Sequence, residues 1–232
     1  QSTITASVGA ELPNLTYFEP AYATEVDWLL CDALDQLSRP GGTSGYLRLS
    51  TRPIDQAPFA RVLAALGEER LRQHVLLGGY RLVDGADDGR PAVTIATTGV
   101  MAPEAVSAAA ELDTEGVQAS VIHLTSPDRV YRSWRNGFAR STATAREVRS
   151  PSHLHRLVPA TERARPVISV HDAASHSLAW LGSALGTQQY ALGVDRFGES
   201  GTIADLHEIT GISTGSIVNA ALVALSGFEL YD

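Results

Sequence analysis

The stretch of sequence that decides the fold is GVDRFGESG, residues 193–201. It begins at the end of an apolar run, residues 190–194, which predicts a strand, and it leads into a helix expected from about Thr202 to Ile209. Asp205 stands three residues after Thr202, a spacing typical of helix capping, although a glycine-rich helix start can also bind an anion. The stretch therefore joins a strand to a helix through a short loop.

Upstream of this loop, apolar runs predict further strands that alternate with helices. The runs at residues 93–96, 117–124 and 167–170 predict strands, and Pro103 opens a helix that continues to about Leu112. A last helix is expected at residues 216–225, with Gly211 as the break before it. Strands that alternate with helices predict an α/β fold with a largely parallel, layered sheet.

The first third of the chain predicts a separate strand, helix and strand. Residues 15–18 and 46–50 form the expected strands, and residues 23–37 carry apolar side chains at helical spacing. Cys31 lies in the apolar run of this helix and is expected to be buried. We expect a linker over residues 59–91, where the segment 84–89 has the composition of a solvated turn.

The composition excludes several classes of function. All 18 cationic residues are arginine, so a Schiff-base lysine, a pyridoxal phosphate attachment and a P-loop lysine are excluded. The net charge of -8 argues against a general nucleic-acid binder, although nine of the arginines lie between Arg129 and Arg165. No apolar run is expected to span a membrane, and a cytoplasmic location is predicted.

Two segments resemble the transketolase superfamily. PNLTYFEPAYATE, residues 13–25, resembles the stretch that follows the pyrimidine-binding core, and residues 193–201 resemble the signature loop of the carboxy-terminal domain. Residues 97–105 and 125–128 also fall where that family places its first strand and helix and the loop after its second strand. The resemblance implies a three-layer α/β/α carboxy-terminal domain over residues 92–232, preceded by the tail of a pyrimidine-binding α/β domain over residues 1–58.

Within this superfamily, residues 46–53 and 78–80 are most similar to 2-oxo-acid dehydrogenases. The resemblance implies the carboxy-terminal portion of a bacterial, homodimeric pyruvate dehydrogenase decarboxylating component. The parent enzyme would decarboxylate pyruvate on thiamine diphosphate and pass the acyl group to a dihydrolipoyl acyltransferase. The alternatives are the carboxy-terminal half of a transketolase and a non-catalytic interaction module of the same fold.

The resemblance implies that the catalytic, cofactor-binding and metal-binding residues lie outside this chain. The family holds its magnesium ion with a Gly-Asp-Gly motif, which this sequence lacks, and its catalytic glutamate would precede Gln1. Thiamine diphosphate and Mg are therefore expected to bind mainly to an amino-terminal portion of the same enzyme, which becomes the first expected partner. In related enzymes an arginine near the end of the second strand lies at the substrate channel, which makes Arg52, and beside it Arg48, the substrate-binding candidates. The alternative is a surface arginine paired with Asp55.

Three further groups of residues have a functional and a structural interpretation. His171, Asp172 and His176 could belong to a metal site or a catalytic triad, but a satisfied helix terminus is the favoured interpretation. GISTG, residues 211–215, matches the nucleophile elbow of hydrolases, but a helix precedes it where a strand is needed. The basic segment 129–165 is expected to meet an acidic subunit or domain, such as the acyltransferase, and neither nucleic acid nor a membrane.

Overall fold

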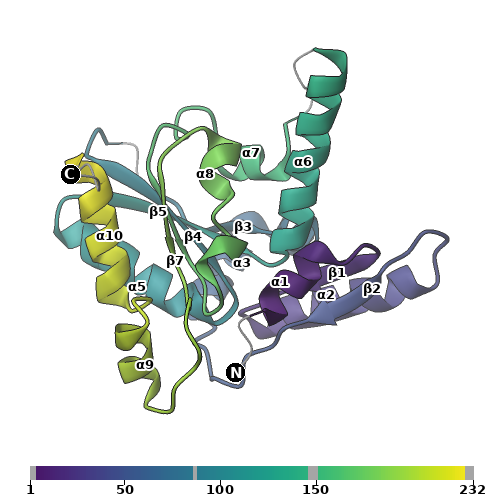
Figure 1. Ribbon diagram of the computed structural model, residues 1–232, viewed down its shortest axis with the longest axis horizontal. Helices are drawn as coiled ribbons and strands as arrows, with labels where there is room; N and C mark the ends of the chain where they lie inside the picture. The colour runs from purple at the N-terminus through teal and green to yellow at the C-terminus, as the bar shows by residue number, and fades with distance from the viewer. Residues whose placement is uncertain (1–3, 86–87, 146–150, 228–232) are drawn as a thin grey trace.

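The computed structural model describes residues 4–85, 88–145 and 151–227. A five-stranded sheet lies at its centre (Figure 1). The strand order is β3-β5-β4-β6-β7, in which β3 runs antiparallel to β5 and all other neighbours are parallel. The strands are β3 (Tyr80–Val83), β4 (Ala92–Thr98), β5 (Gln118–Leu124), β6 (Val167–Val170) and β7 (Gln189–Leu192). The predicted α/β fold with a mostly parallel sheet is confirmed.

Helices cover both faces of this sheet, which makes three layers. One face packs against α5 (Ala102–Thr114) and α10 (Thr214–Ser226). The other packs against α6 (Pro127–Thr144), α7 (His153–Leu157) and α8 (Leu181–Leu185). Neighbouring residues of one strand belong to opposite clusters: Ile95 packs on the first side and Ala96 on the second, because side chains alternate along a strand. Burial on both faces explains why the strands are continuous apolar runs.

The amino-terminal elements form a smaller unit against one end of this sheet (Figure 1). Strands β1 and β2 make a two-stranded parallel sheet. The elements are α1 (Thr5–Glu11), β1 (Leu15–Phe18), α2 (Ala23–Leu37), β2 (Ser44–Leu47), α3 (Ala57–Leu66) and α4 (Glu68–Leu77). The outer edge of β1 is covered, because the Tyr17 backbone donates to Asp128 and accepts from the Ser126 hydroxyl.

The structure corrects one prediction about this region and adds detail to a second. Cys31 is exposed rather than buried, because it lies on the face of α2 that points away from Leu29 and the core. The expected linker, residues 59–91, contains most of α3, all of α4 and β3, and β3 is the edge strand of the large sheet. The sheet therefore begins at Tyr80, upstream of residue 92, while the division into domains at 58 and 91 stays a prediction.

The end of the described chain contains two helices, as the sequence predicts. Gly211 has a φ of +70° and ends α9 (Ile203–Ile209), after which Ser213 caps α10. By length and composition the 24-residue stretch Ile203–Ser226 is apolar enough to cross a membrane, contrary to the expectation from the sequence. The turn at Gly211 divides this stretch into helices of 7 and 13 residues, each shorter than the roughly 20 residues a membrane span requires.

The capping arrangement predicted at Thr202 is confirmed and yields a first testable prediction. The Thr202 hydroxyl oxygen accepts from the Asp205 backbone at 3.2 Å. Replacing Thr202 with alanine removes this acceptor and is expected to weaken α9 by about 1 kcal/mol. Amide hydrogen exchange in residues 203–209 should then be about fivefold faster. Thr202→Ser, which keeps the hydroxyl, should leave the exchange rates unchanged; equal acceleration in both variants would contradict the capping role.

Candidate functional site

The two sheets meet at Glu19, the residue that follows β1. Its backbone N–H donates to the carbonyl of Thr125, after β5, at 2.8 Å, and its carbonyl accepts from Gly99, after β4, at 3.1 Å. Gly99 has a φ of +52°, and a Cβ there would lie 2.8 Å from Cγ of Glu19. The approach of Glu19 to the carboxyl ends of β4 and β5 therefore requires glycine at position 99.

The Glu19 side chain is the centre of a buried group of charged and polar residues. Arg48, just after β2, contacts Glu19 and donates to the two carboxylate oxygens of Asp172 at 2.6 and 3.0 Å. Nε2 of His171, just after β6, lies 2.9 Å from Glu19, whose other oxygen accepts from the Tyr17 hydroxyl. We call Tyr17, Glu19, Arg48, His171 and Asp172 the Glu19 cluster. It joins residues from three separate parts of the sequence.

The pKa values show how strongly these charges interact. Burial alone would raise the pKa of Glu19, but the charge and hydrogen bond of His171 and the charge of Arg48 outweigh burial and lower it to about 2. Burial and the Glu19 carboxylate raise the pKa of Tyr17 well above its usual value. Near neutral pH the Glu19 side chain is therefore an anion, and the Tyr17 hydroxyl keeps its proton.

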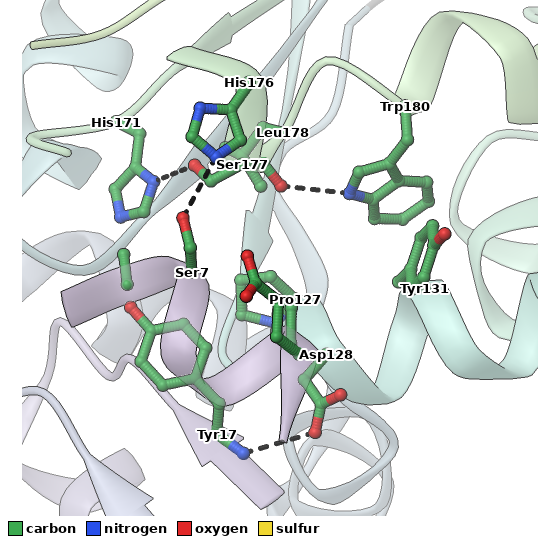
Figure 2. Close-up of a pocket in the computed structure, with 13 residues that line it drawn as sticks. Ser7, Tyr17, Pro127, Asp128, Tyr131, His171, His176, Ser177, Leu178 and Trp180 are labelled. Atoms are coloured by element: carbon green, nitrogen blue, oxygen red, sulfur yellow. Dashed lines mark hydrogen bonds between the residues drawn. The ribbon is translucent and has the colours of Figure 1, made fainter. Parts of the chain in front are cut away.

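The hydrogen bonds of His171 extend the cluster towards a cavity of about 280 Å³ (Figure 2). Nδ1 of His171 lies 2.7 Å from the Ser177 hydroxyl, which itself donates to the carbonyl of Ala174. His171 thus links the Glu19 carboxylate to Ser177 in the wall of this cavity. Figure 2 also shows His176 pointing toward Ser7, with its Nε2 3.0 Å from the hydroxyl.

A second cavity, of about 250 Å³, lies on the other side of the cluster. Glu19, Arg48 and Asp172 line it together with residues 49–51 and Gly99. The guanidinium of Arg48 donates to the carboxylates of Glu19 and Asp172 and also to the backbone carbonyl of Asp172, at 3.1 Å. The two carboxylates that line this cavity are therefore already paired with Arg48.

The same residues have the composition of a metal site but not its electrostatics. Glu19, His171 and Asp172 place potential ligand atoms within 4.8 Å of one another. The guanidinium of Arg48 contacts both carboxylates and supplies the positive charge that a metal ion would supply. Nε2 of His171 already lies within hydrogen-bond distance of Glu19, at 2.9 Å. We conclude that these residues are an ion-pair network.

The glycine-rich loop of residues 193–201 holds the segment that carries His176 and Ser177. The Val194 N–H donates to the carbonyl of Ala173 at 2.8 Å, and the Asp195 carboxylate accepts from the Ser175 N–H at the same distance. A Cβ on Gly193 would lie 2.5 Å from the Ser175 backbone. This loop therefore fixes the position of His176 and Ser177, which line the cavity of about 280 Å³.

The structure separates the two arginines that the sequence considers together. Arg48 joins the Glu19 cluster, whereas Arg52 lies 2.5 Å from Glu104, which also contacts His207 at 3.3 Å. Asp55, the alternative partner of Arg52, instead accepts from the Ala57 backbone. Arg52 does not line either cavity beside the cluster, and its role in substrate binding stays a prediction.

The favoured interpretation of His171, Asp172 and His176 as a helix terminus is wrong for the first two residues. His171 and Asp172 follow a strand and meet Glu19 and Arg48, while His176 lies in a short 3-10 helix, η2 (Ser175–Ser177). Sequence reasoning also missed Glu19, which it assigned to a turn. A glutamate directly before Pro20 and after an apolar strand was the available signal, but its partners Arg48 and His171 lie 29 and 152 positions away.

The pKa of Glu19 predicts how acid affects stability. Because the folded-state pKa is about 2 and the usual value is 4.5, ionised Glu19 stabilises the fold above pH 4.5, and this contribution is lost as the pH falls towards 2. The difference in unfolding free energy between the wild type and Glu19→Gln should therefore be largest at pH 6 and shrink by about 2–3 kcal/mol by pH 2.5. Urea unfolding at several pH values measures it, and a constant difference would contradict the ionised state.

Comparison with known proteins extends these observations. The model of the "Transketolase-like TK C-terminal domain" family matches residues 78–213. A chloroplastic transketolase of Craterostigma plantagineum is 25% identical over 210 residues, which cover 90% of this chain and 34% of that protein. Transketolase 10 of the same plant is 28% identical over 211 residues, 26% of its length. The chain thus spans about a third or less of these relatives.

Solved structures show the same fold. A transketolase mutant from Pichia stipitis superposes with a TM-score of 0.69 at 20% identity, over 99% of this chain and 28% of that chain. A structure described as "Split gene transketolase, inactive beta4 tetramer" gives a TM-score of 0.64 at 20% identity. This match covers 97% of the present chain and 62% of the split-gene chain.

Proposed function

Because the chain belongs to the family of transketolase-like carboxy-terminal domains, we propose that it is the carboxy-terminal part of a thiamine-diphosphate-dependent transketolase. The parent enzyme would transfer a two-carbon ketol unit between phosphorylated sugars. The observation that carries this proposal is the similarity to transketolases over 90% of the chain, from the amino-terminal unit through the large sheet.

The residues of this chain do not fit the diphosphate and metal end of the cofactor. The sequence has no Gly-Asp-Gly, and in the carboxylate and histidine group of the described residues both carboxylates are already paired with Arg48. We therefore assign this chain a supporting role and derive no catalytic step from it. Cofactor binding is assigned to the amino-terminal portion of the enzyme.

Two surfaces of the amino-terminal unit, the edge of β2 and one face of α2, support the proposal that a partner binds this unit. Within the described residues β2 pairs only with β1, and a parallel sheet of two strands is far smaller than those that are stable in proteins. Leu30, Leu34 and Leu37 also form an exposed apolar row on α2, with Leu37 67% exposed. We propose that the amino-terminal portion of the enzyme covers this row and extends the sheet beyond β2.

Reconstitution tests the proposal. The purified chain, with thiamine diphosphate and magnesium, is expected to show no ketol transfer alone and measurable transfer after mixing with the amino-terminal portion. Leu34→Asp should prevent reconstitution, because it places a charge in the apolar row. Glu111→Arg, an exposed change on α5, serves as the control and should leave reconstitution intact. Cofactor binding or turnover by the chain alone would contradict the assignment.

A second candidate is the carboxy-terminal portion of a 2-oxo-acid dehydrogenase decarboxylating component. Residues 46–53 and 78–80 favour it, whereas the relatives identified by comparison are transketolases. Decarboxylation of pyruvate with acyl transfer to a lipoyl acyltransferase, without ketol transfer, would establish this candidate. A homodimer, a cytoplasmic location and a bacterial source stay predictions.

A further inference from the structure

A hollow of about 580 Å³ lies between α6 and α7, apart from the Glu19 cluster. Arg140, Arg156 and Arg163 line it, together with His153, Phe138 and other apolar and small polar side chains. No aspartate or glutamate is among its described lining residues, although the protein carries a net charge of -8. We call it the α6–α7 hollow. Its size is typical of sites for small molecules.

Two of the three arginines have guanidinium groups that are available to a ligand. Arg163 is anchored, because it donates to the carbonyls of Val158 and His155. Arg140 and Arg156 are exposed, and their guanidinium groups make no hydrogen bond or ion pair with any residue in the described ranges. Elsewhere arginines such as Arg81 and Arg129 pair with carboxylates. Two unpaired guanidinium groups beside one hollow favour an anion, above all a phosphate.

His153 lies in the wall of the hollow. This buried ring has Nε2 2.6 Å from the carbonyl of Gly79, whereas its Nδ1 is buried and has no partner within the described part of the chain. Burial is the main cause that lowers the pKa of His153 to about 4; the Gly79 carbonyl opposes this shift, and the charges of His74 and Arg156 add to it. His153 is therefore neutral at pH 7, and the charge of the hollow comes from arginine.

The apolar side chains in the wall of the α6–α7 hollow indicate which kind of anion would fit it. Phe138 is 50% exposed and Leu77 48% exposed, and both line the hollow beside the arginines. Inorganic phosphate would leave these side chains in water, whereas a molecule with a phosphate and a flat apolar ring would cover both kinds of surface. The concave shape suits such a molecule better than a folded acidic domain.

We propose that the α6–α7 hollow binds a mononucleotide, with its phosphate on Arg140 and Arg156 and its base against Phe138 and Leu77. The site is separate from the Glu19 cluster, because none of its described lining residues belongs to that cluster.

Calorimetric titration of the intact chain with AMP, adenosine and inorganic phosphate tests this proposal. We expect AMP to bind more tightly than inorganic phosphate and adenosine to show no measurable binding. Arg140→Ala and Arg156→Ala should each weaken AMP about tenfold, and Phe138→Ala should weaken AMP but not phosphate. Arg72→Ala, an exposed arginine of α4 outside the hollow, is the charge-matched control and should bind AMP normally.

A second readout separates binding in the hollow from binding elsewhere. A phosphate near Arg156 should raise the pKa of His153, and NMR of its ring at several pH values measures this shift. No AMP binding, equal binding to the arginine variants, or an unchanged His153 would overturn the proposal. Binding of an acidic polypeptide such as polyglutamate, lost in the arginine variants while AMP does not bind, would instead identify a protein-docking surface.

Discussion

Replacing Arg48 with methionine should lower the free energy of unfolding by about 3–5 kcal/mol, because it leaves a buried carboxylate with too little positive charge. Glu19 and His171 are each 1% exposed, and Arg48 is the side chain that bridges Glu19 to Asp172. Methionine keeps most of the length of the side chain, so the loss reports charge and hydrogen bonds rather than packing. Urea unfolding at pH 7 measures the change.

Two variants show whether the effect belongs to the buried pair. Arg39→Met removes an ion pair with Asp35 in which both side chains are more than half exposed, and it should cost at most about 1 kcal/mol. Adding Glu19→Gln to Arg48→Met should recover part of the loss, because the uncompensated charge is then gone. Equal costs for Arg48→Met and Arg39→Met, or no recovery in the double variant, would contradict a buried ion pair at Glu19.

Replacing Gly193 with alanine should destabilise the chain by about 1–3 kcal/mol. The new Cβ would lie 2.5 Å from the backbone nitrogen and Cα of Ser175 and 2.6 Å from the carbonyl oxygen of Ala173. All three atoms are backbone, so no side-chain rotation relieves the contact. The loop carrying His176 and Ser177 would have to move, and the urea midpoint should fall.

Gly215→Ala is the matched control for Gly193→Ala. Gly215 lies in the first turn of α10, and a Cβ there meets only the Ser213 hydroxyl at 3.9 Å. Alanine favours a helix over glycine by up to about 1 kcal/mol, so this variant should be neutral or slightly stabilising. A Gly193→Ala protein as stable as Gly215→Ala would show that the close approach to Ser175 can relax without cost.

Local sequence patterns predict most of the secondary structure correctly. The strand Leu15–Phe18 and the helix Ala23–Leu37 have the expected bounds, because apolar spacing and a proline turn act over a few residues. The strand expected at residues 46–50 is observed at Ser44–Leu47. Strand β3 was missed, since Tyr80–Val83 is short and its pairing with β5 joins residues 40 positions apart.

The contacts of the candidate site are harder to predict from local sequence patterns. Arg48 and Arg52 both follow the predicted strand, and no local feature shows which one meets a buried carboxylate. The partners of Arg48 are Glu19 and Asp172, which lie 29 and 124 positions away. Arg52 instead meets Glu104, on a helix that the sequence places in another domain. Cys31 shows the same difficulty, since the sequence does not reveal which face of α2 meets the core.

The sequence by itself determined the α/β class, the order of most helices and strands, the family resemblance of residues 193–201 and the absence of lysine chemistry. Only the tertiary structure decided that Glu19, Arg48, His171 and Asp172 form one ion-pair network. It also decided that Arg140 and Arg156 face a hollow whose described lining residues include no carboxylate. The physical reason is the distance along the chain over which each kind of interaction acts. Backbone preferences and apolar periodicity act between near neighbours in the chain, whereas charges interact through space between residues that only folding brings together.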